Sequence, residues 1–169
     1  MNDYLDILEG HYLIRRLPPY YPNVRKRLVK SPRVYIRDSG MLHYLLGITA
    51  ERKLLESAKR GSSFEGMMIE QIIASEQLSR PGSRFYFYRT HAGAEVDLVV
   101  DRGSERLGFE FKCSASAGPE DWANLKSSIG EHIIDRGYVI CTGNRSYSAS
   151  DTITVLAAEN FLAERCVAD

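Results

Sequence analysis

The sequence predicts an α/β protein with a mixed β-sheet, and three observations lead to this prediction. The segments 94–100 and 107–113 alternate apolar and charged residues around a turn-rich link, which indicates an antiparallel hairpin. The segment 64–78 precedes them and carries apolar residues at helical spacing. The continuous apolar run 137–141 follows another predicted helix, as expected for a buried parallel strand reached by a helical crossover.

Composition places the chain among ordinary globular proteins. Its 169 residues suffice for one medium domain, or a small domain with an appendage, and 44% are hydrophobic and 26% charged. No run approaches the roughly 20 apolar residues of a membrane span, so we expect no membrane contact. The acidic N-terminus is unlike a signal peptide. Three cysteines without a Cys-x-x-Cys pair argue against zinc and favour a reducing, cytoplasmic location.

The N-terminal segment, residues 1–46, predicts a helix followed by a β-hairpin. Residues 2–9 have helical spacing and end before Gly10, while 11–17 and 33–37 have strand character. A helix followed by a basic hairpin resembles the last part of a winged helix. Because such a unit cannot bury a core alone, we expect it to be a winged-helix-like remnant preceding a main domain over 47–169.

The basic residues gather in the same segment. Residues 11–37 contain eight arginines and lysines and no acidic residue, although the whole chain has 22 of each sign. Such a block can neutralise phosphates, and the candidates for nucleic-acid contact are Arg25, Lys26, Arg27 and Lys30. The block could equally face an acidic partner surface or be solvated.

The rest of the chain predicts alternating elements. Asp38 and the next two residues cap a short helix over 41–46, and Ser62 or Ser63 caps the helix over 64–78. From residue 63 the predicted order is α-β-β-β-α-β-β-α. The remaining expected elements are helices over 49–58, 120–129 and 157–165 and strands over 84–89 and 151–156.

The charged residues of the central hairpin are the candidate site. Residues i and i+2 of a strand share one face, so Glu95 lies beside Asp97 and Glu110 beside Lys112, opposite a core face that includes Val96, Leu98 and Val100. Same-face neighbours are roughly 7 Å apart, and carboxylates on adjacent strands can share a hard cation such as Mg²⁺. The metal would activate water and clamp a phosphodiester, and a lysine would orient the water. Alternatively, these charges form only a solvated pair.

The spacing of Asp97, Glu110 and Lys112 resembles that of the PD-(D/E)XK nuclease superfamily, the restriction-endonuclease-like fold. The resemblance implies an αβββαβ core in which Asp97 and Glu110 bind Mg²⁺ or Mn²⁺ and Lys112 assists catalysis. A glutamate on the preceding helix, matched by Glu65, is common in that superfamily. From spacing alone Glu65 could instead stabilise the start of its helix through the helix dipole.

A closer resemblance extends along nearly the whole chain. The segments Val34–Gly40, Gly61-x-x-Phe64-Glu65, Glu95-Val96-Asp97 and Glu110-Phe111-Lys112 are similar to the C-terminal domain, of poorly defined function, of prokaryotic AAA-type ATPases. This resemblance implies a missing N-terminal ATPase module. The chain has no phosphate-binding loop of the Gly-x-x-x-x-Gly-Lys type, so we expect no ATPase activity of its own.

Two functions follow as expectations. The first is a metal-dependent nuclease acting on DNA phosphodiesters through Asp97, Glu110, Lys112 and Glu65. The second is a catalytically inactive module that binds nucleic acid or protein and regulates an attached ATPase. An oligomerisation domain is a weaker third reading. The sequence predicts neither the oligomeric state nor the nucleic acid preferred.

Overall fold

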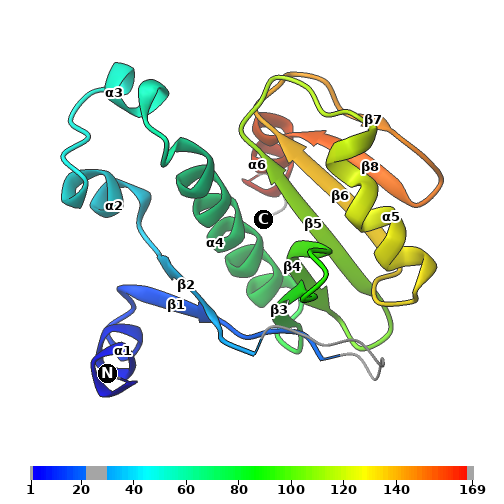
Figure 1. The fold of residues 1–169 in the computed structure, drawn as a ribbon, viewed down its shortest axis with the longest axis horizontal. Coiled ribbons are helices and arrows are strands. Elements are labelled where there is room, and N and C mark those ends of the chain that lie inside the picture. Colours follow the sequence, from blue (N-terminus) through cyan, green and yellow to red (C-terminus); the bar gives the residue numbers. More distant parts are fainter. Residues whose placement is uncertain (1, 22–29, 167–169) are drawn as a thin grey trace.

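The computed structural model describes residues 2–21 and 30–166, and a six-stranded mixed sheet forms its centre (Figure 1). The strands lie in the order β3-β4-β5-β6-β8-β7. The pairs β3–β4, β4–β5 and β7–β8 are antiparallel, whereas β5–β6 and β6–β8 are parallel. The mixed α/β prediction is therefore confirmed. The strand bounds are β3 Arg84–Arg89, β4 Glu95–Asp101, β5 Arg106–Lys112, β6 Arg136–Cys141, β7 Tyr147–Ser148 and β8 Ile153–Ala157.

Helices cover both faces of this sheet. The helices α4 (Arg60–Ser79) and α6 (Ala158–Cys166) contribute to one core cluster, in which Met68, Ile69 and Ile72 are fully buried. The 3₁₀ turn η1 (Pro119–Trp122) and α5 (Ala123–Gly130) cover the other face, around Leu125. Each fully buried aliphatic side chain stabilises the fold by about 1.5–3 kcal/mol relative to exposure, so the two clusters hold the three layers together.

The N-terminal segment forms a small two-stranded sheet with two short helices. Its elements are α1 (Asn2–Gly10), β1 (Ile14–Leu17), β2 (Arg33–Ile36) and α2 (Ser39–Leu45), and a third short helix, α3 (Glu51–Glu56), follows it. The strands pair antiparallel from Ile14↔Ile36 to Leu17↔Arg33, as expected for a hairpin. The predicted cap of α2 is also present, because the backbone N–H of Met41 donates to the Asp38 side chain at 2.6 Å.

The hairpin contacts both the sheet and α4. The backbone N–H of Tyr20 donates to the Phe87 carbonyl at 2.6 Å, and the N–H of Phe87 donates to the Pro18 carbonyl at 3.0 Å. Leu17 is 1% exposed and belongs to the core cluster that contains the α4 residues. The first strand of the hairpin therefore extends along β3 and shares the main core.

Two local details differ from the sequence prediction. The helix α4 begins at Arg60 rather than at a Ser62 or Ser63 cap, and the Ser63 hydroxyl lies 2.7 Å from the His43 ring Nε2 instead. The strand β7 was not predicted, because two residues are too few to show a period.

The predicted shared core face of Val96, Leu98 and Val100 is wrong. Leu98 and Val100 pack in the cluster that contains the α4 residues, whereas Val96 packs in the cluster on the α5 side. The cause is a β-bulge: Tyr86 pairs with Val99 but Tyr88 pairs with Val96, so β4 has one extra residue there. Beyond the bulge, the alternation of faces is shifted by one position.

None of the helices among the described residues is both long enough and apolar enough to span a membrane.

Candidate functional site

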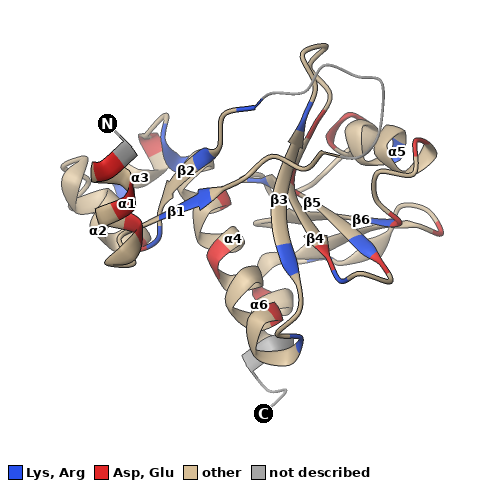
Figure 2. Cartoon of the chain, turned by 90° about the horizontal axis from the view of Figure 1, so that it is seen from below, with Lys and Arg blue, Asp and Glu red and all other residues tan. Residues whose placement is uncertain are grey.

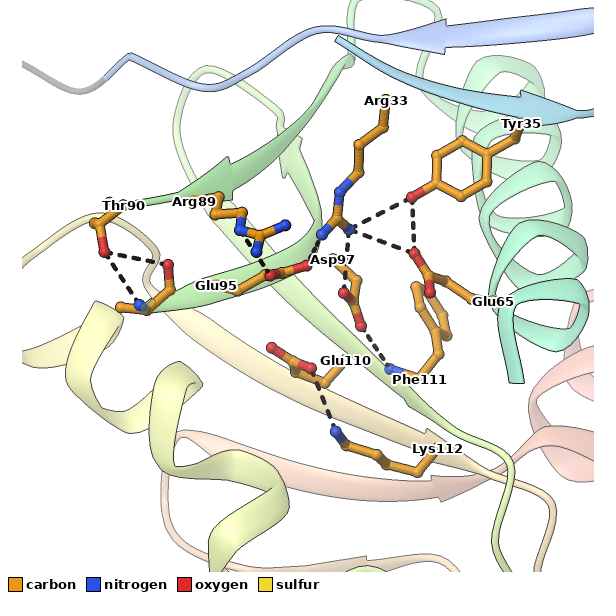
Figure 3. Close-up of polar contacts among 11 residues, drawn as sticks. Arg33, Tyr35, Glu65, Arg89, Thr90, Glu95, Asp97, Glu110, Phe111 and Lys112 are labelled. Carbon is orange, nitrogen blue, oxygen red and sulfur yellow. Dashed lines mark hydrogen bonds and ion pairs between the residues drawn. The ribbon is translucent and has the colours of Figure 1, made fainter. Parts of the chain in front are cut away.

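Asp97 and Glu110 lie where the ladder between β4 and β5 ends. The last pair at that end is Leu98↔Phe109, and the next position along the register places Asp97 opposite Glu110. Beyond that pair, a side chain takes the place of a backbone acceptor. The backbone N–H of Phe111 donates a hydrogen bond of 3.2 Å to Asp97 Oδ2 (Figure 3). The two carboxylates predicted from spacing are therefore brought together by two neighbouring strands.

Glu110 is the most unusual of the acidic residues. It is 5% exposed, and its Oε1 atom is buried with no hydrogen-bond partner among the described residues. Burial, followed by the negative charge of Asp97, raises the pKa of Glu110 to about 9. At neutral pH Glu110 therefore keeps its proton, which it can share with Asp97 through a side-chain hydrogen bond, and a cation between the two strands would take the place of that proton.

Lys112 follows Glu110 on the same face of β5, as predicted. Its Nζ lies 3.9 Å from Glu110 Oε2 and 3.8 Å from Asp121 Oδ1, within ion-pair range but too far for a hydrogen bond. The Lys112 side chain is about one-third exposed, so its ammonium group lies between the buried Glu110 side chain and the solvent. Asp121, on η1, was not predicted as part of the site, because only the crossover after β5 brings it there.

Glu65 reaches the site from the start of α4. The Tyr35 hydroxyl donates to its Oε1 at 2.7 Å. Burial and then the charge of Asp97 raise the pKa of Glu65, while burial and then the charge of Glu65 raise the pKa of Tyr35. The structure thus places Glu65 near Asp97 across the layer between helix and sheet.

Arg33 occupies the space between these acidic side chains (Figure 3). Its Nη1 lies 3.3 Å from Asp97 Oδ1 and 3.4 Å from Glu65 Oε1, and its Nη2 pairs with Glu95 Oε1. The sequence predicts Arg33 only as one of the basic residues of segment 11–37, and it places Glu95 beside Asp97 without giving it a role. The strand spacing of β2 gives no hint that Arg33 points into an acidic cluster 64 positions further along the chain.

The donor set suits a hard divalent cation bound with water. Carboxylate oxygens are the ligands that Mg²⁺ and Mn²⁺ prefer, and the buried Glu110 Oε1 is available for one. Within residues 2–21 and 30–166, however, no three His, Cys, Asp or Glu side chains converge as they would around a metal.

Half of the basic block is already paired within the chain. Arg16 contacts Asp6 and Glu9, Arg33 contacts the acidic cluster, and Arg15 and Arg37 both bind Glu70 on α4. Figure 2 shows basic positions on β1 and β2 near acidic positions of α1 and α4. Of the predicted nucleic-acid contacts, Lys30 is exposed, while Arg25, Lys26 and Arg27 lie outside the described residues.

Comparison with known proteins relates most of the chain to families without an assigned function. The family described as a domain of unknown function, DUF4143, matches residues 60–161, and a second domain of unknown function, DUF8612, matches residues 1–52. The first match includes Glu65, Asp97, Glu110 and Lys112, whereas the second includes Arg33.

Two curated mycobacterial proteins are similar to the chain. They are the uncharacterized protein Rv2008c of Mycobacterium tuberculosis and the uncharacterized protein Mb2031c of Mycobacterium bovis, each 35% identical over 159 residues. The alignments cover 94% of this chain but 35% of each relative. The chain therefore spans about a third of the length of the curated relatives it matches. No solved structure matches it.

Proposed function

The chain belongs to the DUF4143 family, and we propose that it is a metal-dependent nuclease-like domain acting on DNA phosphodiesters. In this proposal the core from α4 to β6 is an αβββαβ core of the PD-(D/E)XK type. The segment before it is a winged-helix-like remnant. Domains of this family are often found at the C-termini of AAA-type ATPases, and we propose that this domain works in the cytoplasm attached to such a module.

The observation that carries the proposal is the buried pair Asp97 and Glu110. Glu110 is 5% exposed, and one of its oxygens has no partner among the described residues. A self-contained structural ion pair would leave no buried oxygen unsatisfied, whereas a site for a cation would. The position opposite Asp97, at the point where two strands separate, gives that cation a second carboxylate.

Each residue then has a chemical role. Asp97 and Glu110 would hold Mg²⁺ or Mn²⁺, and the ion, when bound, would stabilise charge on the phosphodiester and activate water. Lys112, 3.9 Å from Glu110, would orient the attacking water. Glu65 would assist by holding a water molecule or a second ion. The raised pKa of Glu110 means that a metal must displace its proton before binding.

A second candidate function is a catalytically inactive regulatory module that binds nucleic acid or protein. The observation in its favour is Arg33, which already neutralises part of the acidic cluster. In that case the basic residues that include Lys30 carry the binding, and the carboxylates are vestigial.

The test is Mn²⁺-dependent cleavage of a DNA duplex and of a single strand by the wild type and by Asp97→Asn. We expect cleavage by the wild type and a loss of about 100-fold or more in the variant, because a metal ligand is removed. The matched control is Asp151→Asn, an exposed aspartate before β8, which should cleave like the wild type. Equal cleavage by wild type and Asp97→Asn would overturn the assignment. DNA binding without cleavage in all three proteins would support the regulatory module.

A further inference from the structure

We infer that Arg33 neutralises Asp97 and Glu65 in the metal-free chain, so that its guanidinium and a divalent cation compete for these two carboxylates. This inference rests on the proposed function and concerns the regulation of that site. Arg33 lies on β2 of the N-terminal hairpin, whereas the carboxylates lie on α4 and β4. Metal loading would therefore be coupled to a segment outside the nuclease-like core.

The contacts of Arg33 are those of a cation shared among several anions. Its Nη1 faces Asp97 Oδ1 at 3.3 Å, Glu65 Oε1 at 3.4 Å and the Tyr35 hydroxyl at 3.5 Å, while Nη2 pairs with Glu95. One positive charge thus lies among three carboxylates from two elements. Asp97 is the carboxylate that this set shares with the proposed metal pair of Asp97 and Glu110.

The Nη1 contacts are also long. Charge-assisted N–H···O bonds usually measure about 2.7–2.9 Å, and all three contacts of Nη1 exceed that range. The guanidinium lies 5.0 Å from the centre of the Phe87 ring, which supports one side of it. The Arg33 side chain is 21% exposed, so a route to solvent is open when another cation takes its place.

Asp97 makes simultaneous occupancy unfavourable. Its Oδ2 accepts from the backbone of Phe111 and its Oδ1 contacts Arg33 Nη1, so a metal on this carboxylate would lie close to the guanidinium. A divalent ion on Oδ1 would place two more positive charges within a few ångströms of the guanidinium, and in a partly buried site that repulsion is weakly screened. Either the arginine or the metal therefore holds Asp97.

The experiment is calorimetric titration of Mn²⁺ into the wild type, Arg33→Gln and Arg89→Gln. Arg89 is the matched control: its Nε lies 3.3 Å from Glu95 Oε2, but it has no recorded contact with Asp97 or Glu65 and its side chain is half exposed. If Arg33 holds the carboxylates about nine-tenths of the time, its loss should tighten Mn²⁺ binding about tenfold. Loss of Arg89 should tighten Mn²⁺ binding only about twofold, because it removes one nearby positive charge without freeing Asp97 or Glu65.

Two outcomes separate this inference from the proposed function. If Arg33→Gln binds Mn²⁺ no more tightly than Arg89→Gln, while Asp97→Asn abolishes binding, the competition is wrong and the metal site remains. If neither the wild type nor Arg33→Gln shows binding that depends on Asp97, both ideas are wrong.

A measurement on the wild type covers the case in which Arg33→Gln does not fold. The Nε–H signal of Arg33 in a nuclear magnetic resonance spectrum should shift during a Mg²⁺ titration, with the same midpoint as metal binding. An Arg33 signal that stays in place while Mg²⁺ binds would overturn the competition.

Discussion

Among the residues that the structure describes, two ionic contacts join the N-terminal hairpin to the rest of the molecule, and they differ in the balance of charge. At Glu70, one carboxylate on α4 receives two arginines: Arg15 binds both oxygens, and Arg37 Nε donates to Oε2 at 2.8 Å. At Arg33, one arginine lies among three carboxylates. The first contact is satisfied by its own members. The second shares Arg33 among three carboxylates, one of which Arg89 also contacts, and it adjoins Glu110 Oε1, a buried oxygen with no hydrogen-bond partner among the described residues.

The difference indicates which contact is structural and which is functional. A bidentate pair with a second arginine is a geometrically specific clamp, and Glu70 is 9% exposed. Next to Arg33, Asp97 and Glu110 are both buried, and two neighbouring buried carboxyl groups destabilise a fold unless a proton or a ligand offsets their charge. The following predictions test that distinction, beginning with the largest expected effect on stability.

Removing the Glu70 charge should destabilise the protein most. Glu70→Gln leaves Arg15 and Arg37 without their anion, and we expect the free energy of unfolding to fall by about 2–3 kcal/mol, below the usual loss for a fully buried pair because both arginines are partly exposed. Urea unfolding at pH 7 measures the loss. Glu65→Gln is the control on the same helix and should change stability by under about 1 kcal/mol, because it also relieves repulsion by Asp97. Equal losses of stability in Glu70→Gln and Glu65→Gln would contradict the distinction between a structural and a functional contact.

Removing the Glu110 charge should stabilise the protein at high pH, whereas removing the Glu70 charge destabilises it. The pKa of Glu110 is raised to about 9 from 4.5, so between these values the folded chain binds more protons than the unfolded chain. The stability that comes from the proton on Glu110 is fully present below pH 4.5 and is lost as the pH rises towards 9. Glu110→Gln should therefore be more stable than the wild type at pH 9, by about 1–3 kcal/mol.

Urea unfolding at pH 5, 7 and 9 checks this sign. The difference between Glu110→Gln and the wild type should grow with pH across that range and shrink towards zero at the acidic end. A difference that is constant with pH would mean that Glu110 is ionised throughout.

Within the Glu70 clamp, Arg15 should matter more than Arg37. Arg15 binds both oxygens of Glu70, whereas Arg37 binds one and also lies 5.5 Å from the Tyr12 ring centre. Because lysine cannot reproduce a forked contact, Arg15→Lys should lower the free energy of unfolding by about 1 kcal/mol. The Arg37→Lys variant should lose less in the same measurement. A larger loss for Arg37→Lys than for Arg15→Lys would mean that Arg37, which follows β2, is the more important partner of Glu70.

Neutralising Lys30 should have the smallest effect on stability. Lys30 is exposed, and Lys30→Gln should change the free energy of unfolding by under about 0.5 kcal/mol. If Lys30 contacts phosphate, the slope of log affinity for DNA against log salt should fall by about one. An unchanged slope would remove Lys30 from the nucleic-acid interface, since a phosphate contact must release counterions.

Much of the fold and part of the site could be predicted from local patterns. The hairpin of β4 and β5 was predicted from alternation around a turn, and spacing then placed Asp97 near Glu110 and Lys112 beside it. These are short-range relations, because the side-chain period of a strand and the length of its turn determine them. The bulge in β4 could not be predicted, because it depends on how β4 pairs with β3.

By itself the sequence determined most of the helices and strands, their order, and the presence of carboxylates and a lysine on two consecutive strands. Only the tertiary structure decided that Arg33 enters the acidic cluster, that Arg15 and Arg37 meet at Glu70, and that Asp121 faces Lys112. The physical reason is separation along the chain. Glu65 and Asp97 lie 32 and 64 positions from Arg33, and only the packing of the hairpin against α4 and the sheet brings these charges within a few ångströms.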